Sequence, residues 1–160
     1  QIRLLLNHGR KQKYKHQIEG YNYRMDALQA AILNTKLTHL NKWTDQRRNH
    51  AEYYTEHLSN SVQPPVEDKH AKHVYYMYEI QAPKRDKLRK YLKKQGIHTG
   101  IHYPIPFHLQ PAYDHLHLPK GSYPVAEKLA EHILSIPMYP ELTKQQQDYI
   151  IDHINTFYEQ

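Results

Sequence analysis

The chain has 160 residues, of which 39% are hydrophobic, and this length is enough for one domain, or two small lobes, with a buried core. It contains no cysteine, which excludes disulfides and thiolate metal sites and fits a reducing compartment such as the cytoplasm. The net charge is +6, but no nucleic-acid motif and no apolar run of membrane-spanning length is present, so we expect neither nucleic acid nor a membrane as a partner.

The first residues predict the end of a buried helix, because apolar residues dominate positions 2–6. A domain boundary is normally polar, so we interpret the chain as part of a larger protein. Gly9 and Gly20 then bracket a polar, basic stretch, which is typical of a loop.

A long helix is predicted from about residue 26 to residue 58. Asp26 can cap its start, and apolar residues recur at helical spacing along it. Because this is long for a helix in a globular domain, we expect a bend near Asn41.

The next segment contains Pro64 and Pro65 and is expected to link two lobes. A strand is predicted over residues 73–81, ending at Pro83. The side chains expected on one face of this strand are Val74, Tyr76, Tyr78 and Ile80.

A short amphipathic helix around Leu88 should end at Gly96, and a second strand is predicted over residues 97–101. Residues 103–121 carry four prolines and little periodicity, which indicates a long ordered loop, a kind of segment that is often functional.

Another helix is predicted to start at Ser122 and Pro124. Residues 133–138 are predicted to form an extended segment. Thr143 and Gln146 form a capping-box pattern before the final helix. The buried face of that helix is expected to consist of Ile150, Ile151, Ile154 and Phe157.

These elements predict an α+β fold, in which a long helix leads into a small lobe with a short sheet and helices packed on it. We expect residues 1–60 to be the end of a large domain with a loop and a long interface helix. Residues 61–72 would be a linker, and residues 73–160 a small α+β domain.

Three segments together resemble the DegT/DnrJ-type sugar aminotransferases, which depend on pyridoxal phosphate (PLP) and have the aspartate aminotransferase fold. The first is Gly-Tyr-Asn-Tyr-Arg-Met-Asp at 20–26, followed by Leu-Gln-Ala-Ala-Ile-Leu at 28–33. The second is Gly96-Ile97, then His-Tyr-Pro-Ile-Pro at 102–106 and His-Leu-Gln-Pro-Ala-Tyr at 108–113. The third is Ala126-Glu127, then Ser-Ile-Pro-Met-Tyr-Pro-Glu-Leu-Thr at 135–143.

The resemblance covers essentially the whole chain but only the C-terminal part of the family pattern. It implies that the lysine that binds PLP lies upstream, so that this chain alone is inactive and the cofactor is bound by the full-length protein. No lysine here is a candidate, because a Schiff-base lysine must be desolvated and those of residues 84–94 lie on a charged helix surface.

The resemblance also implies that Asn22 reaches across a homodimer interface to the PLP phosphate of the partner subunit. An amide N–H₂ can donate to a phosphate oxygen, although asparagine also often serves only to turn or cap a chain. Arg24 could clamp a carboxylate or a diphosphate, or form only a surface ion pair.

The loop that follows residue 101 resembles the family segment that closes over the sugar substrate. Its candidate substrate-binding residues offer donors and acceptors for a hydroxylated ring, although tyrosines and prolines in loops also often only pack. These residues are His102, Tyr103, His108 and Tyr113. The chain has 14 histidines, but none stands at metal-ligand spacing with carboxylates, so we expect no metal site.

The predicted function of the full-length protein is transfer of an amino group from glutamate, or a similar donor, to a nucleotide-linked keto-sugar, in surface polysaccharide or amino-sugar biosynthesis. One alternative is a PLP-dependent sugar dehydratase of the same family. Another is a non-enzymatic module that binds sugar nucleotides or has a regulatory role.

Overall fold

The computed structural model describes residues 1–159, and the chain divides into two compact units, Gln1–Asn41 and the part that begins at Lys42. The border lies inside helix α3 (Leu40–His57). No helix among the described residues has both the length and the apolar composition needed to cross a bilayer.

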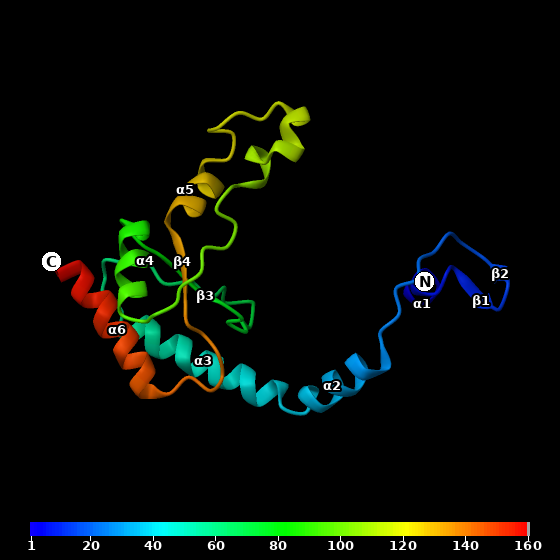
Figure 1. Ribbon diagram of the computed structural model, residues 1–160, viewed down its shortest axis with the longest axis horizontal. Coiled ribbons are helices and arrows are strands. Elements are labelled where there is room, and N and C mark those ends of the chain that lie inside the picture. Colours follow the sequence, from blue (N-terminus) through cyan, green and yellow to red (C-terminus); the bar gives the residue numbers. More distant parts are fainter. Residues whose placement is uncertain (160) are drawn as a thin grey trace. The chain divides into compact units, whose positions relative to one another are not determined.

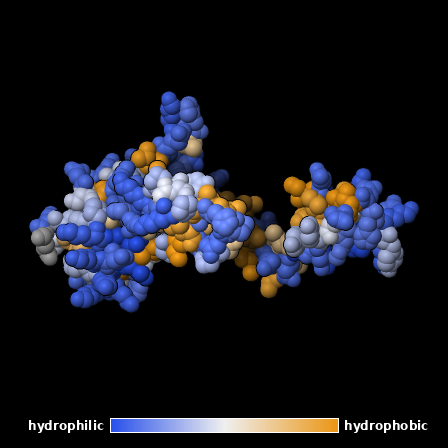
Figure 2. Space-filling model, turned by 90° about the horizontal axis from the view of Figure 1, so that it is seen from above, coloured by the Kyte–Doolittle hydropathy of each residue, from blue (hydrophilic) through white to orange (hydrophobic). Residues whose placement is uncertain are grey.

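The first unit contains α1 (Ile2–Leu6), the short antiparallel strands β1 (Arg10–Gln12) and β2 (Lys15–His16), and α2 (Ala27–Leu37). None of the buried hydrophobic side chains of the described chain lies in this unit. Figure 2 shows apolar surface in orange, and the large apolar residues of α2 are all exposed. They are Leu28, Ile32, Leu33 and Leu37.

Two helices replace the single one predicted over residues 26–58. Asp26 caps α2 as expected, its Oδ1 accepting a hydrogen bond of 2.8 Å from the Leu28 N–H. The expected bend is a complete break at residues 38–39, just before α3. The hydroxyl of Thr38 donates to the carbonyl oxygen of Thr35 here, a local side-chain bond that competes with regular helix geometry.

The second unit is a small α+β fold, as predicted. Strand β3 (Tyr78–Gln81) pairs antiparallel with β4 (Ile133–Ile136). Helices α3, α4 (Arg85–Lys94) and α6 (Lys144–Glu159) lie beside this pair (Figure 1). One hydrophobic core joins these five elements. Its fully buried side chains include Tyr54, Tyr78, Ile80, Leu88, Leu92, Leu134 and Ile154.

One of the two predicted strands is shorter than expected, and the other does not form. Residues 73–77 are not strand: Tyr75 has a left-handed backbone (φ +45°), which interrupts the alternation, so that Tyr75 is buried while Val74 and Tyr76 are exposed. Residues 97–101 form no strand either, and only Gly100 pairs, through two backbone hydrogen bonds to Ser135.

The predicted helix ends are confirmed. Gly96 follows α4 with φ +74°, where a side chain would be strained. Before α6, the Thr143 N–H donates to Gln146 Oε1 (2.9 Å) and the Gln146 N–H to Thr143 Oγ1 (3.2 Å), a reciprocal capping box.

The segment between residue 102 and α5 (Pro124–His132) is irregular, with two short 3₁₀ helices, η1 (Phe107–Leu109) and η2 (Pro111–Leu116). α5 continues into β4 without a connecting residue. The long loop therefore begins beside Gly100, which pairs with β4, and ends at the helix that leads into β4.

Candidate functional site

Asn22 is held by backbone pairing between residues 21–23 and the end of α1. The Tyr21 and Tyr23 N–H groups donate to the carbonyls of Leu5 and Leu6, and Asn22 itself pairs with Asn7. Within this unit Gly20 lies so close to Gly9 that a Cβ on Gly20 would stand 2.1 Å from the Gly9 nitrogen. Only glycine fits there, so the glycine pair fixes where the Asn22 segment begins.

Asn22 and Arg24 form a pair of exposed donors. Arg24 Nε donates to Asn22 Oδ1 at 3.0 Å, which orients the amide and leaves its N–H₂ and the remaining guanidinium N–H groups available. Both side chains line a cavity of about 390 Å³ next to the start of α2. This arrangement suits an anion with several oxygens, such as a phosphate.

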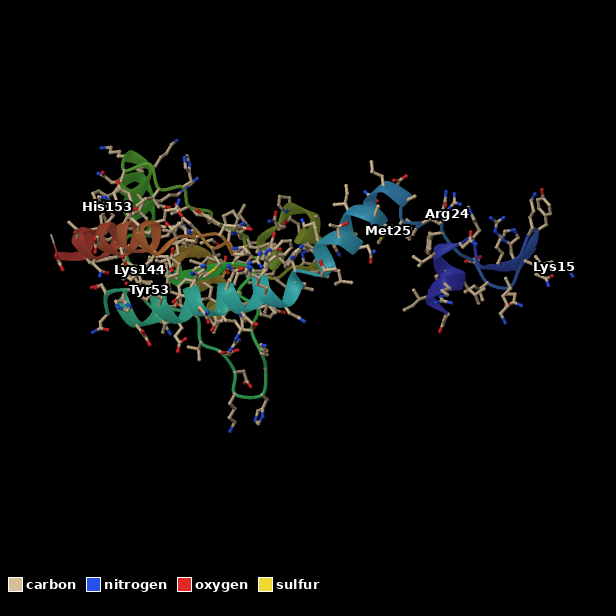
Figure 3. The ribbon with its side chains drawn as sticks, turned by 90° about the horizontal axis from the view of Figure 1, so that it is seen from below. Lys15, Arg24, Met25, Tyr53, Lys144 and His153 are labelled. Carbon is tan, nitrogen blue, oxygen red and sulfur yellow. The ribbon has the colours of Figure 1, made fainter. Side chains whose placement is uncertain are left out.

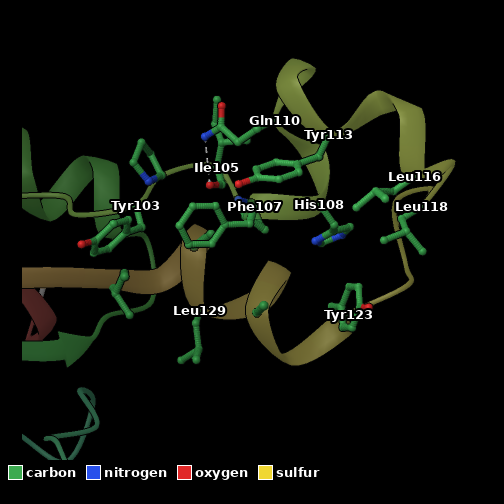
Figure 4. Close-up of a pocket in the computed structure, with 15 residues that line it drawn as sticks. Tyr103, Ile105, Phe107, His108, Gln110, Tyr113, Leu116, Leu118, Tyr123 and Leu129 are labelled. Carbon is green, nitrogen blue, oxygen red and sulfur yellow. Dashed lines mark hydrogen bonds between the residues drawn. The ribbon is translucent and has the colours of Figure 1, made fainter. Parts of the chain in front are cut away.

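A second, larger cavity lies between the 103–123 loop and α5, with a volume of about 880 Å³ (Figure 4). Tyr103, His108 and Tyr113 line it, so the structure brings three of the four predicted loop residues together. Phe107 also lines it and packs against Tyr113, with ring centroids 6.1 Å apart.

The walls of this cavity are mainly apolar and aromatic. Leu116, Leu118, Tyr123 and Leu129 complete its labelled lining in Figure 4, and Gln110 adds an amide that bonds the Ile105 carbonyl at 3.4 Å. An apolar cavity with a few hydroxyl and amide groups is the usual form of a site for a small organic ligand.

His102 lies apart from this cavity and contacts the strand pair. Its Nδ1 is 2.8 Å from Ser135 Oγ, and the Ser135 hydroxyl donates to Glu79 Oε1 at 3.0 Å. Because that hydroxyl proton is committed to Glu79, the Ser135 oxygen accepts from His102 Nδ1–H. His102 therefore fixes the start of the loop to β4.

Glu127 is a buried carboxylate in the first turn of α5, and sequence reasoning gave it no role beyond membership of a motif. Its Oε1 lies 2.9 Å from His108 Nε2, and the side chains of Glu127 and His108 are only 10% and 6% exposed. Its two oxygens also accept the Gly121 N–H at 2.8 and 2.9 Å. Only the fold brings residues 108 and 121 to one carboxylate, so no local pattern could reveal the contact.

The pKa of Glu127 reflects these contacts. Burial raises it, but hydrogen bonds from the Gly121 N–H, His108 and the Tyr123 N–H outweigh burial, and the pKa is lowered. The carboxylate is therefore ionised at neutral pH and acts as an acceptor for its neighbours.

The lysines of the described residues are all exposed. Lys144 has the strongest partners: its Nζ lies 2.8 Å from Asp148 Oδ2 and 2.8 Å from the Tyr53 hydroxyl, between α3 and α6 (Figure 3). These hydrogen bonds raise the pKa of Lys144, whereas a lysine that forms Schiff bases needs a lowered one. Residues 1–159 also contain no cluster of three potential metal ligands.

The chain was compared with models of known protein families. The model of the DegT/DnrJ/EryC1/StrS aminotransferase family matches residues 1–155.

Two curated relatives match nearly the whole chain. A protein of Geobacillus stearothermophilus named pleiotropic regulatory protein is 48% identical over 160 residues, which are 98% of this chain and 43% of the relative. The dTDP-3-amino-3,4,6-trideoxy-alpha-D-glucose transaminase of Streptomyces venezuelae is 38% identical over 160 residues, 99% of this chain and 42% of the relative.

Among solved structures, DesV of S. venezuelae matches with a TM-score of 0.95 and 37% identity, covering 99% of this chain and 43% of that protein. The chain thus spans less than half the length of these relatives.

Proposed function

Because the chain belongs to the DegT/DnrJ/EryC1/StrS aminotransferase family, we propose that it is the C-terminal part of a PLP-dependent enzyme. The full-length protein transfers an amino group from glutamate, or a similar donor, to a keto-sugar carried by a nucleotide, for amino-sugar or surface-polysaccharide synthesis. The observation that carries this proposal is the family match over residues 1–155, together with a named sugar transaminase that is 38% identical across the chain.

The residues of the first unit fit the phosphate of PLP. Asn22 has an oriented amide with free N–H₂ donors, and Arg24 adds a positive charge 3.0 Å from it. In the proposal, Asn22 donates to the PLP phosphate of the partner subunit in a homodimer. PLP, when bound, supplies the electron sink for the exchange of nitrogen between donor and sugar.

The exposed apolar face of α2 supports an interface in the full-length protein. Monomeric soluble proteins rarely leave such a continuous stripe uncovered, and Leu28, Ile32 and Leu37 are each more than half exposed. In our proposal residues 1–60 are the end of the large domain and this interface, residues 61–72 a linker, and residues 73–160 the small domain.

The cavity below the 103–123 loop is proposed to face the sugar. Tyr103 and Tyr113 supply hydroxyl groups, and the apolar wall excludes water from the reacting carbonyl. The lysine that binds PLP is proposed to lie outside this chain, which is supported by the exposure of every described lysine.

The Geobacillus relative provides a second candidate function, because its name describes a regulatory protein and it is 48% identical to this chain. In this alternative the full-length protein binds a sugar nucleotide and regulates without turnover.

One experiment separates the two. The full-length protein is loaded with PLP, and the visible absorbance of the cofactor is followed during addition of glutamate and then of a nucleotide keto-sugar. Loss of the absorbance with glutamate and its return with the sugar supports the transaminase. Binding of PLP without any response to amino donors contradicts it and favours the regulatory alternative.

A further inference from the structure

The 103–123 loop is attached to α5 through one buried side chain. Glu127 Oε1 lies 2.9 Å from Nε2 of His108, at the beginning of the loop. It also accepts hydrogen bonds from the N–H groups of Gly121 (2.8 Å) and Tyr123 (3.3 Å), at the end of the loop. These contacts lie on either side of η2, so a single carboxylate closes the loop.

Among the described residues, an ion pair also joins this loop to α5, but it is weak. Lys120 and Glu131 stand 3.6 Å apart, and both side chains are more than 60% exposed. An exposed ion pair of this kind contributes little to the free energy of folding. A buried carboxylate without hydrogen-bond donors, in contrast, costs much free energy. Of these two acidic residues of α5, Glu127 therefore makes the stronger contacts with the loop.

His108 connects this attachment to the cavity. Its ring lines the cavity and packs edge-on against Tyr123, with ring centroids 4.9 Å apart. Glu127 itself is not among the residues that line the cavity. The carboxylate thus acts on the cavity only through the residues that it holds.

We propose that Glu127 is a positioning residue that fixes His108 and the 103–123 loop as the wall of the sugar-binding cavity. The link to the sugar rests on the proposed function, while the link to the loop rests on the geometry alone. The two links can be tested separately.

The first test measures hydrogen–deuterium exchange of the loop amides in Glu127→Ala, Glu127→Gln and the matched control Glu131→Ala, which lies on the same helix. In Glu127→Ala, the amides of Gly121, Tyr123 and η1 should exchange at least about tenfold faster, while amides of α6 keep their rates. Glu127→Gln keeps an acceptor oxygen and should show a smaller increase, and Glu131→Ala should match the wild type.

Loop exchange in Glu127→Ala within about twofold of the wild type would overturn the proposal. If Glu127→Ala does not fold, Glu127→Gln decides, and rates equal to those of Glu131→Ala would overturn it.

The second test uses steady-state kinetics of the full-length protein. Glu127→Ala should raise KM for the nucleotide keto-sugar at least about tenfold, while the half-reaction with glutamate is unchanged and Glu127→Gln restores part of the loss. A lowered kcat with an unchanged KM for the sugar would contradict a positioning role. If the wild type has no transaminase activity, the proposed function fails, but the exchange experiment still decides the role of Glu127 in the loop.

Discussion

Arg48 of α3 and Glu67 form a bidentate ion pair, with N···O distances of 2.6 and 3.2 Å. Glu67 also accepts the His73 N–H at 2.7 Å, and Arg48 donates to the His73 carbonyl at 2.7 Å. This network holds Glu67 and His73 against α3, just before Tyr75, where the backbone leaves the extended conformation.

The ion pair predicts an acid-sensitive stability. Hydrogen bonds from Arg48 and the His73 N–H, which outweigh burial, lower the pKa of Glu67 from 4.5 to about 2. Because the folded-state pKa is the lower one, the stabilisation is complete above pH 4.5 and is lost as the pH falls towards 2. The free energy of unfolding, measured with urea between pH 6 and pH 2, should therefore decrease over this range.

Glu67→Gln should flatten this decrease. Asp152→Asn, at an exposed carboxylate of α6 for which the described residues show no ion pair, serves as the control and should keep it. Equal pH dependence in the wild type and Glu67→Gln would show that the pair contributes nothing.

Asn22→Ala should weaken PLP binding by the full-length protein. A hydrogen bond to a charged group contributes about 1.5–3 kcal/mol, so the dissociation constant should rise roughly tenfold to a hundredfold. The measurement is a titration followed by cofactor absorbance, with Asn34→Ala on the exposed surface of α2 as the control. An unchanged dissociation constant would remove Asn22 from the cofactor site.

Thr143→Ala should destabilise the fold through loss of the cap of α6. Such a substitution at an N-cap costs about 1 kcal/mol, seen as a lower midpoint of urea unfolding. Gln146→Ala removes the other half of the capping box, while the neighbouring Gln145→Ala removes an exposed side chain and should have almost no effect. If the variants at 145 and 146 behave alike, the reciprocal bond does not stabilise the helix.

Tyr54→Phe should lower the free energy of unfolding by about 1–3 kcal/mol, because it leaves a partly buried acceptor without its donor. The Tyr54 hydroxyl donates to the Pro137 carbonyl at 3.0 Å, and burial raises the pKa of this tyrosine. Tyr76→Phe, at a side chain that is 74% exposed, is the control and should stay within about 0.5 kcal/mol of the wild type. The free energy of unfolding at pH 7 is the quantity to compare.

Local signals in the sequence predicted local structure well. Asp26, Gly96 and the Thr143–Gln146 pair each cap a helix as expected, because a cap is determined by a few neighbouring residues. The α+β class followed from the same periodicities. The extent of the strands could not be predicted from these periodicities. The break at Tyr75 lies beside the contact of Arg48 with Glu67, which are 19 residues apart in the chain.

The grouping of the candidate loop residues was predictable only in part. Tyr103, His108 and Tyr113 line one cavity, as a functional loop suggested, but His102 bonds Ser135, whose position depends on the pairing of β4. Glu127 belongs to the third of the segments that resemble the family. Its role comes from contacts with residues 108 and 121 that only the folded loop creates.

The direct passage from α5 into β4 has a mechanical consequence. His132 ends the helix and Ile133 begins the strand, so no slack separates the carboxylate of Glu127 from Ser135, to which His102 is bonded. A rotation of α5 would displace Ile133, the first residue of β4, which pairs with Gln81 of β3. The helix that holds the end of the loop and the strand to which its beginning is bonded are therefore one continuous segment, Pro124–Ile136.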